Sequence, residues 1–364
     1  MAQLAPPGSD ARARGRVALT LGFFEAEAAR VARLCLLLAE RFVAGGRLLA
    51  VGGSPQAWSD AHHVAVEFVH PVIVGKRALP ALAVSPHDVA RLARPHDVVI
   101  SFEPPTIAGE VFEPPTDDPF VAQELGETLY HVLWELVHVF FEHLQGSSAG
   151  AGASSFLYPF LEREAADLDA VVEDVRRSVL MKAEEVAELR AQTLAENAAE
   201  LDAAADAVRR SLEAGGTLFA FGNGGSATDA EDLVADFRAA PQGWPSRRAL
   251  DLGADPAILT ALANDIGPEV LFARQLIAYA QRGDVALAIS TSGGSTNVIA
   301  ALAEARRRGL TTVAFVGYDG GLIAAEQLAD HVVVTRSDHI PRIQEAQASA
   351  YHVLRELIER SETA

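Results

Sequence analysis

Short apolar runs alternate with amphipathic stretches along the second half of the chain. The apolar runs occupy residues 217–221, 285–290, 312–317 and 331–335. Segments 229–237 and 297–308 instead carry apolar residues at helical spacing, and Gly309 ends the second of them. Strands that alternate with helices predict an α/β fold of the flavodoxin-like or Rossmann-like type, with a parallel sheet covered on both faces.

An Ala-, Glu- and Arg-rich segment precedes this alternation, from about residue 161 to residue 212. It has apolar residues at helical spacing and almost no helix breakers, so it predicts long helices. In parallel sheets, ligands bind where loops leave the carboxyl ends of the strands. We therefore expect functional residues in the loops after the runs at 217–221 and 285–290.

The chain also repeats itself. The matching segments are residues 123–136 with 344–357, and residues 43–50 with 213–220. Eight of fourteen positions are identical in the first pair. The offset between the copies grows from 229 − 60 = 169 at Asp229 to 352 − 131 = 221 at His352, so the first copy is shorter by 52 residues in its middle. The repeat predicts a tandem duplication.

A stretch of small and polar residues separates the two copies. Residues 145–155 contain only Gln, Gly, Ser and Ala and are typical of a flexible linker. The predicted domains are a first copy at 1–144, a linker at 145–155 and a second copy at 156–364.

The composition is that of a soluble globular chain, with 364 residues, 49% apolar and 22% charged. A single cysteine, Cys35, excludes an internal disulfide and fits a reducing compartment. No apolar run is long enough to span a membrane, so we expect a cytoplasmic protein with no membrane partner. The net charge of −19 argues against direct nucleic-acid binding. An anionic ligand would need local amides and hydroxyls.

Two loops offer such groups. Residues 221–226 form a glycine-rich turn where a strand passes into a helix, and the free amides of that helix favour an anion. Residues 290–296, here named the serine loop, place five hydroxyls within seven residues before another helix. Together the hydroxyls and amides form a neutral cradle for a phosphate. The alternatives are a tight turn only for the first loop, and a helix cap with spare serines for the second.

These motifs resemble the sugar isomerase (SIS) domain, and within it the phosphoheptose isomerase branch. The resemblance rests on residues 222–226, 263–265, 290–295, 317–321 and 342–345, and covers about 182–359. The first copy resembles the domain more loosely, over about 21–141. The resemblance implies a five-stranded parallel sheet in each copy, sites at subunit interfaces, and aldose–ketose isomerisation of a phosphosugar through an enediol, with no nucleotide cofactor.

The family's functional residues carry over to named positions. Those for substrate binding are Asn223, Gly224, Ser226, Asp265, Ser290, Thr291, Ser292, Ser295 and Gln344. The resemblance assigns proton transfer to Asp236 and His352, although the family's base is usually a glutamate. The first copy keeps the glutamate, as Glu67, together with His131. Isomerisation needs such an acid and base close together.

The first copy also holds a metal-ligand pattern. In some family members the positions of His63, Glu67, Gln123 and His131 hold zinc, and His, Glu and an amide oxygen are acceptable zinc ligands. The second copy has Asp232, Asp236, Gln344 and His352 there, a set richer in oxygen. The alternative is that the two histidines at 131 and 352 merely face the core of the scaffold.

The first copy has no hydroxyl-rich loop after its strand at 98–101. Residues 102–106 include Glu103, which repels an anion, and two prolines, which lack amide donors. The leading hypothesis is a phosphoheptose-type isomerase that binds a small phosphorylated sugar and forms a homodimer of double-SIS chains. The alternative is a non-catalytic phosphosugar-binding or protein-binding regulatory protein.

Overall fold

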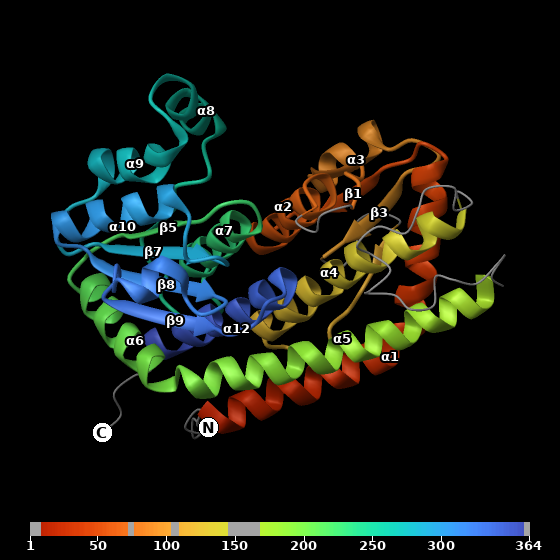
Figure 1. Ribbon diagram of the computed structural model, residues 1–364, viewed down its shortest axis with the longest axis horizontal. Helices are drawn as coiled ribbons and strands as arrows, with labels where there is room; N and C mark the ends of the chain where they lie inside the picture. Colours follow the sequence, from red (N-terminus) through yellow and green to blue (C-terminus); the bar gives the residue numbers. More distant parts are fainter. Residues whose placement is uncertain (1–8, 72–75, 103–108, 145–167, 360–364) are drawn as a thin grey trace. The chain divides into compact units, whose positions relative to one another are not determined.

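Every paired strand in the computed structural model is parallel to its neighbours, and the strands form two separate sheets (Figure 1). The structure describes residues 9–71, 76–102, 109–144 and 168–359. Its described residues cluster into a first unit within 18–187 and a second unit made of 9–17 and 188–359. The linker expected at 145–155 lies outside the described residues, so the domain boundaries stay a prediction.

The second unit is built on a five-stranded sheet of order β6-β5-β7-β8-β9. Its strands are β5 (Leu218–Phe221), β6 (Ala249–Asp251), β7 (Val285–Ser290), β8 (Thr311–Gly317) and β9 (His331–Thr335). Its helices are α6 (Ala198–Glu213), α7 (Gly225–Arg238), α8 (Pro256–Asp265), η2 (Pro268–Val270), α9 (Leu271–Tyr279), α10 (Thr296–Arg308), α11 (Gly321–Ala325) and α12 (Ile340–Ile358). The parallel five-stranded sheet expected of the second copy is confirmed.

Alternating strand residues serve the two faces of this sheet. Leu218 and Leu287 belong to the core formed with α6, α7 and α12, whereas Phe219 and Ala288 belong to the core formed with α9, α10 and α11. All six residues of β7 are buried, as expected for a central strand covered on both sides. The apolar runs along the sequence are therefore strands whose side chains lie in two cores, one on each face of the sheet.

Two details depart from the sequence pattern. Strand β6 was not predicted, since it is a three-residue edge strand in which only Ala249 is buried. The long helical segment is divided at Asn197 into α5 (Leu168–Glu196) and α6. The Asn197 side chain donates to the carbonyl of Val334 at 2.9 Å and accepts from its amide at 3.0 Å, which fixes the break against β9.

The first unit contains a smaller parallel sheet of order β2-β1-β3-β4. Its strands are β1 (Leu48–Val51), β2 (Ala81–Val84), β3 (Val98–Ser101) and β4 (Glu110–Val111). Its helices are α2 (Pro55–Val69), α3 (Pro86–Leu92) and α4 (Pro119–Leu144), with most of α1 (Ser9–Val43) and the first part of α5. The Ser54 hydroxyl accepts from the amide of Ala57 at 3.2 Å, and Pro55 follows, so α2 begins with a standard cap.

The size difference between the copies has a structural counterpart. In its described residues the first unit has four strands where five were expected, with none matching β9. The seven-residue α3 also stands between the second and third strands, where the second unit has α8, η2 and α9. The segment between β7 and β8 has 20 residues, whereas the one between β3 and β4 has 8. The 52 residues missing from the first copy are thus divided among the segment beyond β6, the segment after β7 and the last strand.

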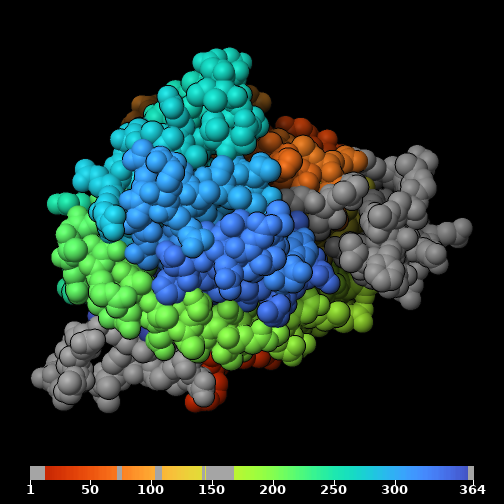
Figure 2. Space-filling view, turned by 60° about the vertical axis from the view of Figure 1, so that its left-hand side comes forward, coloured from red at the N-terminus to blue at the C-terminus, as the bar shows by residue number. Residues whose placement is uncertain are grey.

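Helix α8 and the short η2 have no buried residue. Asp255 caps α8, and its carboxylate accepts from the amides of Ala257 and Ile258. Figure 2 shows the teal segment that includes α8 standing out from the surface around α10. Among the described residues no helix has the length and apolar character needed to cross a bilayer.

Candidate functional site

The serine loop lies at the carboxyl end of β7, the central strand of the second unit, and leads into α10. Ser290 is buried, Thr291 and Ser295 are half-buried, and Ser292 is exposed. The loop therefore extends from the end of the core to solvent. Its amides and hydroxyls precede the N-terminus of a 13-residue helix, where anions are favoured.

Hydrogen bonds inside the loop set its shape. The Ser290 hydroxyl accepts from the amide of Gly293 at 3.2 Å, and the Ser292 hydroxyl accepts from that of Gly294 at 3.3 Å. Ser295 occupies the N-cap position of α10, but its side chain makes no capping hydrogen bond. Its hydroxyl is thus not engaged in the capping role that the sequence left open as an alternative.

The turn after β8 packs against the serine loop. Gly293 has a φ of 59°, and a Cβ atom there would lie 2.2 Å from the carbonyl oxygen of Gly320. A Cβ atom on Gly321 would likewise meet the Ser292 carbonyl at 2.3 Å, and the amide of Ile323 donates to the Gly293 carbonyl at 3.0 Å. Glycines are required because two backbones touch here.

The glycine-rich turn after β5 lies beside the serine loop. Gly224 has a φ of 59° and caps α7, Ser226 is buried in the first turn of that helix, and Asn223 is exposed. The side-chain amides of Asn223 and Asn297 donate to each other, at 2.9 Å in both directions. The structure thus brings the two predicted phosphate loops together at neighbouring strands β5 and β7, where the order of the sheet reverses.

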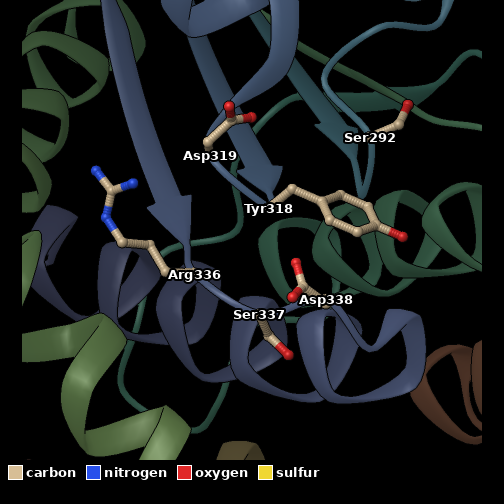
Figure 3. Close-up of a pocket in the computed structure, with 6 residues that line it drawn as sticks. All are labelled: Ser292, Tyr318, Asp319, Arg336, Ser337 and Asp338. Atoms are coloured by element: carbon tan, nitrogen blue, oxygen red, sulfur yellow. The ribbon is translucent and has the colours of Figure 1, made fainter.

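A pocket of about 650 Å³ adjoins the serine loop through Ser292. Its other lining residues are Tyr318, Asp319, Arg336, Ser337 and Asp338, from the carboxyl ends of β8 and β9. Figure 3 shows the Tyr318 ring between Ser292 and Asp338, with the Asp319 carboxylate pointing away from the ring. Tyr318 has a φ of 54°, a rare conformation for a residue with a side chain and one that recurs at functional sites.

The second unit also contains a buried acid–imidazole group. The Nε2 atom of His352 lies 3.4 Å from an oxygen of Asp232 and 3.4 Å from an oxygen of Asp236. The hydroxyl of Tyr351 donates to Asp232 at 2.8 Å. Two carboxylates and an imidazole at this spacing could exchange protons or hold a cation.

The predicted catalytic and phosphate residues of this unit are not side by side. Ser226 and Asp236 stand ten residues apart on α7, which corresponds to roughly 15 Å along the helix axis. An extended phosphosugar with eight bonds of about 1.5 Å between phosphorus and C1 spans roughly 10 Å. A substrate with its phosphate at the N-terminus of α7 does not reach Asp236 of the same unit.

Two further predicted substrate residues lie in different surroundings. Asp265 ends α8, is exposed, and accepts from the neighbouring Asn264 at 2.7 Å. Gln344 is buried in the first turns of α12, eight residues before His352 on the same helix. The roles of both residues stay predictions.

A second buried group lies in the first unit, where α2 meets α4. The Nε2 atoms of His63 and His131 are 3.3 Å apart, and His63 Nε2 lies 3.9 Å from an oxygen of Glu67. Zinc bonds of about 2.0–2.1 Å place tetrahedral ligands roughly 3.3 Å from one another, so the two imidazoles already have the spacing of zinc ligands. Among the described residues the second oxygen of Glu67 has no hydrogen-bond partner, which also suits a metal ligand.

Burial controls the protonation of this group. Burial, and secondarily the nearby Glu135, raises the pKa of Glu67 to about 8. Burial also lowers the pKa of His63 well below its usual value, with His131 adding to the effect. Neutral imidazoles are the form that binds a metal. Glu135 itself forms an ion pair with Lys182.

Other predictions for the first unit are less fully defined by the structure. The amide nitrogen of Gln123 approaches the Ser59 hydroxyl at 3.5 Å, and its place as a fourth ligand stays a prediction. The anion-repelling loop expected at 102–106 falls mostly outside the described residues. The residues that the structure brings together for a metal ion in the first unit are therefore His63, Glu67 and His131.

Sequence reasoning missed two residues at these sites. Tyr351 contacts Asp232, and a signal for it was present, because a Tyr-His pair occurs in both copies as Tyr130-His131 and Tyr351-His352. Asn297 pairs with Asn223 across 74 residues of sequence. No local pattern signals that contact.

Comparisons with known proteins point to one family. The SIS domain profile matches residues 183–317. A phosphoheptose isomerase of Thermodesulfovibrio yellowstonii is 38% identical over 177 residues, which are 48% of this chain and 87% of that protein. A phosphoheptose isomerase of Roseiflexus sp. (strain RS-1) is 39% identical over 192 residues, which are 51% and 93% of the two chains.

A solved structure resembles a larger part of the chain. The C-terminal domain of glucosamine-fructose-6-phosphate aminotransferase from Francisella tularensis is 10% identical, with a TM-score of 0.58. The match covers 95% of this chain and 93% of that domain. At this identity the likeness shows the fold alone, and it includes both sheets.

Proposed function

Because the chain belongs to the phosphoheptose isomerase family of SIS-domain proteins, we propose that it interconverts a heptose 7-phosphate and sedoheptulose 7-phosphate. The observation that carries this proposal is the contact between the glycine-rich turn and the start of α10, next to the serine loop, at the carboxyl ends of β5 and β7. A site of this kind suits a small phosphorylated ligand.

In the proposed site, phosphate is bound by hydroxyls and amides, and Arg336 is the one cationic side chain that lines the adjoining pocket. The chain has a net charge of −19, so the ligand depends on hydroxyls and helix N-terminal amides. The proposed phosphate ligands are Ser226, Ser290, Thr291, Ser292 and Ser295. The pocket beside Ser292 adjoins these residues.

Two sets of side chains are candidates for proton transfer between C1 and C2. Asp236 with His352 is the set in the second unit, and Glu67 with His131 is the set in the first. The separation along α7 argues against Asp236 acting on a ligand seated at Ser226 of its own unit. Glu67 keeps the carboxylate usual in the family. Both pairs stay candidates in this proposal, and single variants of each pair decide between them.

The group at His63, Glu67 and His131 fits zinc by its donor atoms and their spacing. Zinc bound there would act as a Lewis acid that polarises a carbonyl oxygen. The protein's own contribution is to bury the imidazoles in their neutral form and to keep the carboxylate close to them.

The assay is direct. Purified protein is incubated with sedoheptulose 7-phosphate and, separately, with hexose and pentose phosphates, and the aldose product is followed by NMR. Turnover of the heptose phosphate alone supports the proposal. If none is isomerised but one raises the melting temperature, the protein is a phosphosugar-binding regulatory module, the candidate favoured by Asp236 in place of the usual glutamate.

Assembly and location complete the proposal. We propose a homodimer of chains, because closed symmetry is the common way for such subunits to associate. Light scattering that gives the mass of one chain contradicts it. We propose the cytoplasm as the compartment, since Cys35 is buried as a free thiol.

A further inference from the structure

We propose that Asn297 is a positioning residue, which fixes the side chain of Asn223 so that it presents an N–H group to the phosphorylated ligand. The proposal rests on the proposed function, because Asn223 belongs to the glycine-rich turn and is the exposed member of the pair, whereas Asn297 is buried. Nothing in the sequence pattern gives Asn297 a role beyond the first turn of α10.

The pair has the geometry of a closed amide dimer. Each Nδ2 donates to the other residue's Oδ1, and both distances are 2.9 Å. Such a ring uses one N–H and one oxygen lone pair of each amide. One N–H and one lone pair of each residue then remain outside the ring.

Asn297 has only one favourable orientation. Its Oδ1 also accepts from the backbone amide of Val298 at 2.9 Å, and the residue is buried. Rotating the amide by half a turn would bring its NH₂ group against the Val298 N–H, two donors facing each other. That arrangement leaves a buried donor unsatisfied, which is unfavourable.

The two hydrogen bonds of the ring also fix the orientation of the Asn223 amide. With the Asn297 oxygen fixed, Asn223 must direct its NH₂ group toward that oxygen and its own oxygen toward the Asn297 nitrogen. Asn223 itself is exposed, so without the partner its side chain would sample several rotamers and both amide orientations. The second N–H of Asn223 is thereby held ready at the point where the sheet order reverses.

A double-mutant cycle tests this mechanism. Asn223→Ala and Asn297→Ala should each weaken binding of sedoheptulose 7-phosphate about tenfold, as expected when one hydrogen bond to a charged group is lost. The double variant should bind no more weakly than either single variant, because both changes remove the same contact. Binding is followed by calorimetry and by KM, and kcat should change less than KM.

Two further variants separate positioning from packing. Asn297→Leu fills the same space without hydrogen bonds, so it should lose as much affinity as Asn297→Ala. Asn197→Ala is a matched control, since Asn197 is also buried and also fixes backbone, at Val334 rather than at the ligand loops. It should lower the melting temperature and leave KM unchanged.

Several results would overturn the proposal: additive losses in the double variant, normal affinity in Asn297→Leu, or an equal loss in Asn197→Ala. The cycle is repeated with inorganic phosphate as the probe, read as a shift in melting temperature. If phosphate binds and no sugar is isomerised, the proposed function fails while the cycle still decides the role of Asn297. If neither phosphate nor sugar phosphate binds the wild type, both fail.

Discussion

The two units place their polar side chains differently around similar sheets. In the second unit, hydroxyls and glycines gather in loops at the ends of β5 and β7, while the buried group on its helices is Asp232, Asp236 and His352. In the first unit, the corresponding helices carry His63, Glu67 and His131. The second unit thus carries the hydroxyl-rich loops, and the first unit carries a buried group with two imidazoles beside one carboxylate.

The largest effect is expected from the proton-transfer groups. Glu67→Gln and His131→Ala should each lower kcat by roughly a hundredfold or more, because each removes one half of the acid–base pair. Asp236→Asn should have a much smaller effect, given its distance along α7 from Ser226. Turnover is measured at saturating sedoheptulose 7-phosphate.

The opposite result would reverse the assignment of the two units. If Asp236→Asn and His352→Ala abolish turnover while the Glu67 and His131 variants remain active, the second unit supplies the acid and base. Circular dichroism on every variant serves as the control for folding, since all four residues are buried.

Metal content is the next comparison. We expect up to about one zinc ion per chain, and His63→Ala should reduce zinc affinity by roughly 10- to 100-fold or more, since it removes one of three buried ligands. Elemental analysis and competition with a chromogenic chelator measure both quantities. Asp232→Ala is the matched variant in the second unit and should leave zinc content unchanged. Protein that neither retains nor takes up zinc contradicts the prediction.

Substitutions in the serine loop should have a moderate effect on ligand binding. Ser292→Ala combined with Ser295→Ala should weaken phosphosugar binding by roughly 1–3 kcal/mol, because hydrogen bonds to a charged group are lost. The loss is read from calorimetry, and the stability of the unliganded protein should hardly change, since Ser295 makes no capping bond. Equal stabilisation of wild type and variant by the sugar phosphate would refute the assignment.

The smallest effect concerns pH and the metal-free first unit. The pKa of Glu67 is raised from 4.5 to about 8, so between these values the folded protein holds a proton that the unfolded chain releases. This contribution to the free energy of unfolding is complete below the lower value and is lost as pH rises through about 8. Denaturant titrations at about pH 6 and pH 8.5 should therefore show a steeper loss for wild type than for Glu67→Gln.

His63 provides the internal control for that measurement. Its pKa is lowered, so its contribution is present above the ordinary histidine value and is lost as pH falls. The two groups act in opposite directions, and the comparison with Glu67→Gln isolates the carboxyl. Parallel pH profiles for the two proteins would contradict a raised pKa.

The parts of this fold that could be predicted are those encoded locally. Six consecutive buried residues make β7 visible in the sequence, and glycines mark the turns at 224 and 293 because only glycine fits there. Strand β6 could not be predicted, because three residues at a sheet edge show no periodic pattern. Helical spacing placed His63 beside Glu67, but their approach to His131 depends on how α2 packs on α4. The Asn223–Asn297 pair depends on strand order in the same way.

The contact of the serine loop with the turn after β8 also has a kinetic consequence. Because Gly293, Gly320 and Gly321 let two backbones touch, the loop is held in one shape before any ligand arrives. We therefore expect a phosphorylated ligand to bind the serine loop without a slow conformational change. The observed association rate should then rise linearly with ligand concentration and show no plateau. Replacing Gly293 with alanine would force the two backbones apart and add a conformational step to binding.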